Sequence, residues 1–393
     1  MDIKKKYEAA LSRIENVHIK SFPGQAGPVF LISTAYPGVW MEHVYDAVMY
    51  ANLNPAGGEV ARNQTLLFLR NQKPGGRMPF NVIDSSVAAG RYGSAVGYSQ
   101  IQECVSFGAL CLEAFRILND REYLKEAYKG LKAWDSWLEK NRMSLDKGLI
   151  ELFCLYDTGH DNSARLSDIP NKCPDVDGIL PVDSDAVPML APDMNAVFYG
   201  DRMALAEMAE ELGRVHEARE WRERAADVKK RMFALLYDPD DLFFYDADRQ
   251  GKKRKFLSIA ISNVFQERVL DKKEADAVYA RHMKNPEEFW TPYPFPSMAI
   301  SDPESKKDRD GNSWGYYSQA LTALRCARWM DFYGYAADYD ALLSRWVEAI
   351  TRSEMNFSQE LDPITGEMSK SSEWYSSALL LYVYACRRLG YVK

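Results

Sequence analysis

The chain has 393 residues, and 47% of them are hydrophobic, which is enough to bury a large core. Its net charge of −7 argues against a nucleic-acid partner, because proteins that bind phosphate backbones usually present a basic face. No stretch approaches the roughly 18 apolar residues of a membrane span, and the first residues lack an apolar signal core. We therefore expect no membrane partner and a cytoplasmic location.

The 6 cysteines are scattered along the chain, form no C-x-x-C pair and often lie within apolar helical runs. This pattern is typical of buried thiols and not of a disulfide or zinc framework. The 5 histidines are also dispersed, which argues against a histidine-based metal centre. We predict no metal and no cofactor, and the composition indicates no particular oligomeric state.

Hydrophobic periodicity predicts about a dozen helices. In chain order they cover 3–15, one segment ending near 52, one ending near 71, 101–118, 122–141, 193–212, 215–236, 257–268, 272–284, 313–332, 336–353 and 373–389. Residues 167–190 show no clear period and are expected to form a long loop. Residues 237–255 are polar and are expected to form a small hairpin.

The predicted helices come in consecutive pairs, with short turns at one end and long loops at the other. There is no βα alternation and no repeat of fixed period. Paired helices of this number close most economically into an all-α (α/α)6 barrel, a toroid of six hairpins. We predict a single catalytic domain over residues 1–393, with 1–35 as an N-terminal helix and the segment that leads into the barrel. The long loops then form one cleft on one rim.

The segment Tyr156–Arg165 is the densest in chemistry, because it combines acids, an amide, hydroxyls, an imidazole and a guanidinium. Asp161 or Ser163 could instead cap a helix. The chain contains no H-E-x-x-H, no Walker A, no G-x-G-x-x-G and no G-x-S-x-G pattern. What remains is carboxylate chemistry with recognition of a hydroxyl-rich substrate.

Several segments, in order along residues 36–389, carry a resemblance to one group of enzymes. Gly159–Arg165 is similar to "G-M-D-N-S-P-R", Gln72–Pro79 to "Q-x-P-D-G-x-I-P", and Asn356–Gly366 to "E-x-Y-N-P-x-T-G". Tyr36–Trp40 is similar to the start of a W-x-W-D segment. The chain thereby resembles the inverting α-glycosidases related to trehalase, processing α-glucosidase I and mannosylglycerate hydrolase, which are (α/α)6-barrel enzymes.

The sequence departs from that group in three places. The W-x-W-D segment is Trp40-Met41-Glu42-His43, and the "R-G-P-x-W" segment, residues 310–314, lacks the Arg. Alignment on residues 363–366 puts Gln359 in the column of the general-base Glu, and a shift of one residue brings Glu360 there. These departures concern the substrate more than the class of reaction.

The resemblance implies Asp161 as the general acid and Glu360 as the general base, with Glu373 as the alternative base. An inverting glycosidase needs two such carboxyl groups roughly 6.5–9.5 Å apart. Each acid also has a plain structural interpretation, as a helix cap, a solvated turn acid and a helix N-terminal acid respectively. The candidate substrate-binding residues are Trp40, Glu42, His43, Gln72, Arg77, Gln102, Tyr156, His160, Asn162, Arg165, Trp314 and Trp374.

Several of these side chains have structural alternatives. The two histidines could be packed residues with satisfied hydrogen bonds, and the tryptophans could belong to the core. We expect Arg165 to orient its loop through a salt bridge. The favoured function is an exo-acting, inverting glycoside hydrolase for a small carbohydrate, a glycoside or an oligosaccharide. The alternatives are a sugar epimerase, isomerase or lyase on the same barrel, and a non-enzymatic helical binding scaffold.

Overall fold

Helices dominate the computed structural model, which describes residues 2–23, 25–33, 36, 38–87, 93–307 and 313–392. They are α1 (Ile3–Arg13), α2 (Val44–Leu53), α3 (Gly58–Arg70), α4 (Phe107–Leu118), α5 (Arg121–Asn141), α6 (Pro192–Glu211), α7 (Val215–Leu235), α8 (Ile261–Gln266), α9 (Lys272–Val278), α10 (Ala320–Arg325), α11 (Ala336–Arg352) and α12 (Ser376–Arg388).

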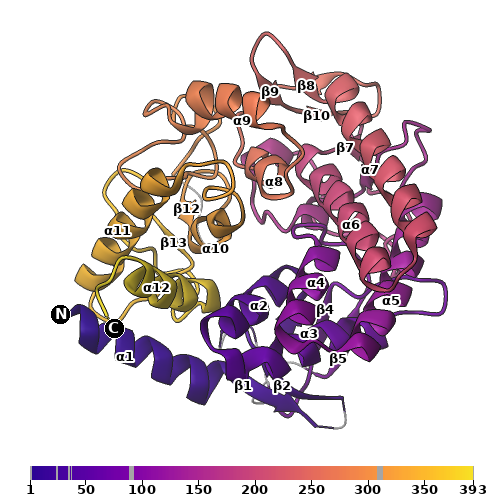
Figure 1. Cartoon of the computed structure of the whole chain (residues 1–393). Coiled ribbons are helices and arrows are strands. Elements are labelled where there is room, and N and C mark those ends of the chain that lie inside the picture. The colour runs from indigo at the N-terminus through magenta and orange to yellow at the C-terminus, as the bar shows by residue number, and fades with distance from the viewer. Residues whose placement is uncertain are drawn as a thin grey trace.

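These helices form a closed ring in which even-numbered helices lie inside and odd-numbered helices outside (Figure 1). On the inside, α2 contacts α4, α4 contacts α6, and α6 contacts α8; α10 contacts α12, and α12 contacts α2. The ring is completed where α8 meets the 3₁₀ turn Cys326–Arg328 that follows α10. This arrangement is the predicted (α/α)6 barrel.

The burial of each helix follows its place in the ring. The inner helix α6 is buried along most of its length, because other helices surround it. The outer helix α7 buries only a stripe at helical spacing, consisting of Ala218, Trp221, Ala225, Val228 and Met232. The inner helices therefore make the core of the toroid, and the outer helices shield it from water.

Several predicted helices begin later than expected, and the differences are largest for α4 and α10. Helix α4 starts at Phe107 instead of 101, because the Ser106 hydroxyl caps it by accepting from the Ala109 amide at 3.1 Å. Helix α10 starts at Ala320 instead of 313, because Ser318 and Gln319 form a strand. The chain before each of these helices contributes to the cleft described below.

Short antiparallel strands join the loops. They are β1 (Ile19–Phe22), β2 (Ala26–Phe30), β3 (Gly38–Trp40), β4 (Asn81–Ile83), β5 (Ala95–Gly97), β6 (Glu151–Leu152), β7 (Met189–Leu190), β8 (Tyr237–Asp238), β9 (Phe243–Phe244), β10 (Asp246–Ala247), β11 (Lys253–Arg254), β12 (Ser318–Gln319) and β13 (Glu360–Leu361). The predicted hairpin in 237–255 is confirmed by the pairing of β8 with β9. The long loop predicted for 167–190 is irregular until β7 at its end.

The cysteines and the helix lengths agree with the sequence analysis. All 6 cysteines are buried free thiols. Over the described part of the chain, every helix is too short or too polar to cross a membrane.

Candidate active site

A cleft of about 520 Å³ opens among the loops at one rim of the barrel. A volume of this size is typical of a site for a small molecule. Its walls come from segments far apart in the sequence, and its lining residues are Ile32, Tyr36, Trp40, Glu42, His43, Phe80, Asn81, Ile83, Gln100, Gln102, Tyr156, Gly159, Asp161, Lys172, Trp314, Leu321, Gln359 and Tyr375.

Asp161 lies on a tight loop that follows the 3₁₀ turn Leu155–Thr158. Gly159 stops this turn in the left-handed region, with φ of 68°, where glycine carries no steric cost. The Trp314 amide donates to the Asp161 carbonyl at 3.1 Å, which ties the loop to the opposite wall. Ser163 takes the N-cap position of the short helix Ala164–Leu166 without a side-chain bond to it, so Asp161 lies outside the cap position.

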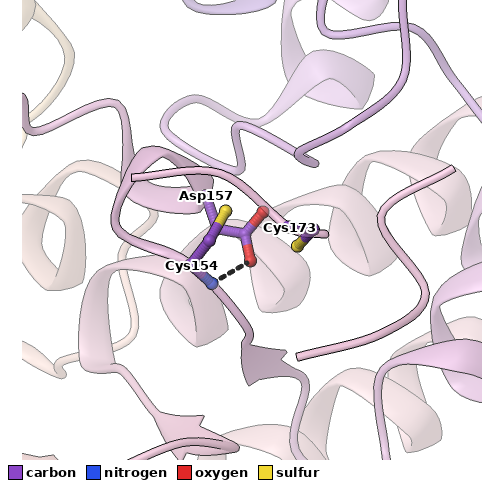
Figure 2. A group of neighbouring side chains, drawn as sticks. All are labelled: Cys154, Asp157 and Cys173. Atoms are coloured by element: carbon purple, nitrogen blue, oxygen red, sulfur yellow. Dashed lines mark hydrogen bonds between the residues drawn. The ribbon is translucent and has the colours of Figure 1, made fainter. Parts of the chain in front are cut away.

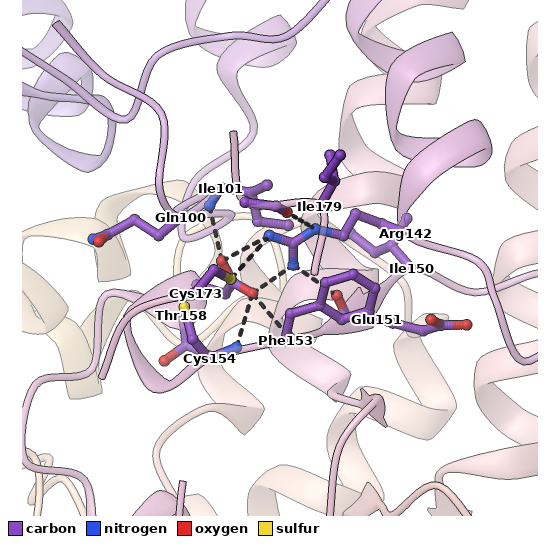
Figure 3. Close-up of polar contacts among 12 residues, drawn as sticks. Gln100, Ile101, Arg142, Ile150, Glu151, Phe153, Cys154, Thr158, Cys173 and Ile179 are labelled. Atoms are coloured by element: carbon purple, nitrogen blue, oxygen red, sulfur yellow. Dashed lines mark hydrogen bonds and ion pairs between the residues drawn. The ribbon is translucent and has the colours of Figure 1, made fainter. Parts of the chain in front are cut away.

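Asp157 stabilises the loop that carries Asp161, called the acidic loop below (residues 159–163), from the turn that precedes it. Its carboxylate oxygens accept from the Phe153 amide at 2.8 Å and from the Ile101 amide at 2.8 Å. Arg142 donates to the same carboxylate at 2.5 and 3.2 Å, and both side chains are fully buried (Figure 3). Burial alone would raise the pKa of Asp157, but the bonds from Arg142 and the amides hold it below its usual value.

Two thiols lie beside Asp157, and one ligand atom from each of Cys154, Asp157 and Cys173 falls within 4.8 Å of the others (Figure 2). The Asp157 oxygens are already bonded to amides and to Arg142. The Arg142 guanidinium also lies 3.9 Å from the Cys173 sulfur. Because a positive group already occupies this position, the cluster suits a buried ion pair better than a cation.

Arg165 anchors the far end of the acidic loop, as expected from the sequence. Its guanidinium bonds Asp246 at 2.6 Å and also bonds Asp193, and all three side chains are buried. His160 packs its ring on Trp314 with centroids 4.0 Å apart and planes at 16°. Burial, together with the charges of Arg165 and Arg325, lowers the pKa of His160 well below its usual value, so this ring stays neutral.

Glu42 is the second acid of the cleft, and its carboxylate lies beside the loop that carries Asp161. Glu42 lies in the 3₁₀ turn Met41–His43 after β3, and Arg325 binds both its carbonyl oxygen at 3.0 Å and its carboxylate at 3.4 Å. His43 is held through Nδ1 by Asp46 at 3.0 Å and through Nε2 by the Tyr375 hydroxyl at 3.0 Å. The His43 Nε2 atom is 3.6 Å from the Glu42 carboxylate.

Gln359 and Glu360 point to opposite sides of the extended segment that pairs with β12. Gln359 lines the cleft. The Glu360 carboxylate faces away, where it accepts from the Ser313 amide at 3.1 Å and from the Gln319 side-chain amide at 2.9 Å. Burial raises the pKa of Glu360, and the bonds from Ser313 and Gln319 oppose this rise. The placement of Glu360 therefore does not favour the role predicted for it.

Of the residues singled out in the sequence, the structure gathers seven in the cleft: Trp40, Glu42, His43, Gln102, Tyr156, Asp161 and Trp314. The remainder do not line it: Gln72, Arg77, His160, Asn162, Arg165, Glu360, Glu373 and Trp374. Residues 310–312 of the Trp314 segment lie outside the described residues.

The residues outside the cleft have visible structural partners. The Gln72 amide donates to the carbonyls of Gly76 and Gly130, and Arg77 donates to the carbonyl of Gln100. Trp374 stacks on Phe357, with ring centroids 5.3 Å apart, and Glu373 beside it is exposed. Gln72 and Arg77 therefore support the loops of the rim, and Trp374 packs near α1.

The polar residues of the cleft that the sequence analysis did not give as candidates include Asn81, Lys172 and Tyr375. Asn81 belongs to β4 directly after the predicted Gln72–Pro79 segment, and Tyr375 follows Trp374. Their position next to predicted motifs was the only signal in the sequence. Lys172 lies in the irregular loop, for which no pattern indicated a side-chain direction.

Three buried polar atoms of the lining lack a hydrogen-bond partner within the described ranges: Gln100 Oε1, Gln102 Oε1 and Trp314 Nε1. Gln102 also adopts φ of 54°, an uncommon backbone conformation for a residue with a side chain. Buried polar groups are normally bonded, so two acceptors and one donor left unpaired at a cleft are suited to ligand hydroxyls.

A family model described as the mannosylglycerate hydrolase MGH1-like glycoside hydrolase domain matches residues 42–377. The chain belongs to this family. It is therefore a glycoside hydrolase, and the resemblance inferred from the motifs is confirmed. A search of curated proteins finds no significant match to this MGH1-like glycoside hydrolase.

Solved structures support the fold. The GH63 mannosylglycerate hydrolase from Thermus thermophilus in complex with Tris has a TM-score of 0.74 at 17% identity, over 97% of this chain and 99% of that chain. Neutral trehalase Nth1 from Saccharomyces cerevisiae has a TM-score of 0.67 at 14% identity, over 97% and 79%. A rhamnosidase from Klebsiella oxytoca with rhamnose bound has a TM-score of 0.61 at 14% identity, over 97% and 64%.

Proposed function

We propose that this MGH1-like glycoside hydrolase is an exo-acting, inverting enzyme with Asp161 as its general acid, and that it works as a single catalytic domain in the cytoplasm. Its substrate would be a small glycoside or oligosaccharide. The observation that carries the proposal is the position of Asp161 in a cleft lined by Trp40, Tyr156 and Trp314. Aromatic faces pack on the apolar faces of sugar rings, and the unpaired amide oxygens of Gln100 and Gln102 can accept from hydroxyls.

In this proposal Asp161 donates its proton to the glycosidic oxygen as the bond to the anomeric carbon breaks. A water attacks that carbon from the opposite face, which inverts its configuration. The backbone bond from Trp314 and the network around Asp157 hold the acid in place, so little reorganisation is needed during the reaction. The size of the cleft is suited to one or two sugar rings, which favours attack at a chain end.

The ligands bound in the similar structures suggest which sugars to try. The Thermus thermophilus enzyme was solved with glucose, and also with Tris and D-glycerate. A first panel therefore contains mannosylglycerate, trehalose and the 4-nitrophenyl α-glycosides of mannose, glucose and rhamnose.

The test is the Asp161→Asn variant. We expect turnover of the best panel substrate to fall at least about 100-fold, because the proton donor is lost, while the melting temperature stays close to that of the wild type. Asp168→Asn is the matched control: Asp168 lies in the same region but is exposed and pairs with Arg254, so turnover should persist.

Full activity of the Asp161→Asn variant would contradict the assignment of the acid. Product NMR supplies a second check, since retained configuration at the anomeric carbon would contradict an inverting mechanism. Product sugar without oxygen from labelled water would favour a lyase or an isomerase instead.

A further inference from the structure

The cleft of an inverting glycosidase needs a second carboxylate, and the segment in which the sequence predicted it does not supply one. Gln359 faces the cleft as a neutral amide, whereas the Glu360 carboxylate is turned away onto Ser313 and Gln319. The Ala320 amide donates to the Gln359 carbonyl at 2.8 Å, and Glu360 pairs with Gln319 in the ladder. A shift of register by one residue would break these bonds, so the two side chains cannot easily exchange sides.

Among the described residues that line the cleft, the acidic side chains are Asp161 and Glu42. The two come from different segments of the chain: Asp161 from the loop after the turn Leu155–Thr158, and Glu42 from the turn after β3. Glu42 is 9% exposed, and this exposure opens onto the cleft. A water molecule can therefore reach its carboxylate.

The Glu42 carboxylate approaches the backbone of the acidic loop closely. Its Oε2 atom lies 3.3 Å from the position that a Cβ would take on Gly159, which is two residues before Asp161. Two residues of chain span at most about 7 Å, so the two acids face the same small space.

The surroundings of Glu42 hold its carboxylate in one orientation. Arg325 binds its carboxylate at 3.4 Å, and the Nε2 atom of His43 lies at 3.6 Å from the other oxygen. Asp46 and Tyr375 fix the His43 ring on its two nitrogens. A carboxylate that is paired, directed and partly open to the cleft meets the geometric needs of a general base.

Resting on the proposed function, we infer that Glu42 is the general base of this enzyme and that the Gln359–Glu360 segment contributes no base. Glu42 takes one proton from the attacking water as the water oxygen bonds to the anomeric carbon. The bond from that carbon to the leaving oxygen breaks, and this oxygen takes the proton of Asp161. The products are a sugar of inverted configuration and an alcohol, and solvent returns one proton from Glu42 to Asp161.

The experiment uses α-D-mannopyranosyl fluoride and α-D-glucopyranosyl fluoride with the full-length protein. Fluoride leaves without help from an acid, so these substrates report mainly on the base. We expect Glu42→Gln to lower turnover at least about 100-fold. The matched control is Glu360→Gln, which keeps the shape of the side chain and should stay within about threefold of the wild type.

Azide separates a lost base from a damaged fold. Azide attacks without losing a proton, so it should restore turnover of the Glu42→Ala variant. In this reaction a C–N bond forms as the C–F bond breaks, and the product is a glycosyl azide of inverted configuration. Turnover of Glu42→Gln near the wild-type rate would overturn the assignment, and so would loss of turnover in Glu360→Gln. The assignment would also fall if azide did not restore turnover of Glu42→Ala while the melting temperature of that variant was unchanged. Wild-type protein that turns over neither the fluorides nor the glycoside panel would instead overturn the proposed function, and this inference with it.

Discussion

Gln359 and Glu360 are neighbours in the chain, yet only Gln359 faces the cleft. Successive side chains of an extended segment point to opposite sides, and the pairing of Glu360 with Gln319 fixes which side each residue takes. An offset of one residue, of little consequence in a motif comparison, thus decides whether a carboxylate reaches the substrate. This relationship shifts the search for the second acid to Glu42.

Gly159 is expected to be intolerant of a side chain. A Cβ at this position would lie 2.5 Å from the Cys104 sulfur, and the backbone there has φ of +68°. We expect Gly159→Ala to lower the free energy of unfolding by about 1–3 kcal/mol from backbone strain, with a further loss from the overlap. Turnover should also fall, because Asp161 is two residues away. Chemical denaturation and glycosidase assays measure the two effects.

Gly213→Ala is the control for this substitution. Its φ is +77°, but no atom lies within 4 Å of the added Cβ, so it should show the strain alone and keep full turnover. Adding Cys104→Ala to the Gly159→Ala variant should recover part of the stability. Equal destabilisation by the two glycine substitutions would show that the contact with Cys104 is unimportant.

Removal of the charge of Asp157 should be costly. Asp157→Asn leaves the Arg142 guanidinium buried without its anion, and breaking such a pair costs about 3–5 kcal/mol. The acidic loop loses its support, so turnover should fall as well. The control is Glu207→Gln, which breaks an exposed pair with Arg116 and should cost less than about 1 kcal/mol. Similar losses in the two variants would contradict the structural role of the buried pair.

Asp201 should make stability depend on pH. Burial, opposed by bonds from Ser106 and Gly108, raises the pKa of this carboxyl from 3.8 to about 7. A raised pKa in the folded state means that the stabilisation is complete below about pH 4 and is lost as the pH rises towards 7. Asp201→Asn cannot ionise, and its amide can keep both bonds through Oδ1. The variant and the wild type should thus melt at similar temperatures near pH 4, and the variant should melt at the higher temperature at pH 8. Parallel melting curves from pH 4 to 8 would contradict this account.

The sequence was most informative about helices and about loops with dense motifs. Periodic apolar positions predicted the helix pairs, because a helix must bury one face whatever its neighbours are. The Tyr156–Arg165 segment was identified because glycine and polar groups cluster there. The predicted starts of α4 and α10 were too early. The Ser106 cap makes α4 begin at Phe107, and the strand at Ser318–Gln319 takes the place of the first part of the second predicted helix.

By itself, the sequence determined the paired-helix barrel, the buried free thiols and the glycoside hydrolase class, since composition, periodicity and ordered motifs are local properties of the chain. Only the tertiary structure decided which polar side chains share one cleft. Gln72, Arg77 and Arg165 sit in or beside the same motifs as the cleft residues, but their side chains bind carbonyls and carboxylates of the loops instead. Side-chain direction depends on strand register and on contacts made by segments hundreds of residues apart, as with Glu42 and Arg325. No local pattern in the chain encodes such contacts.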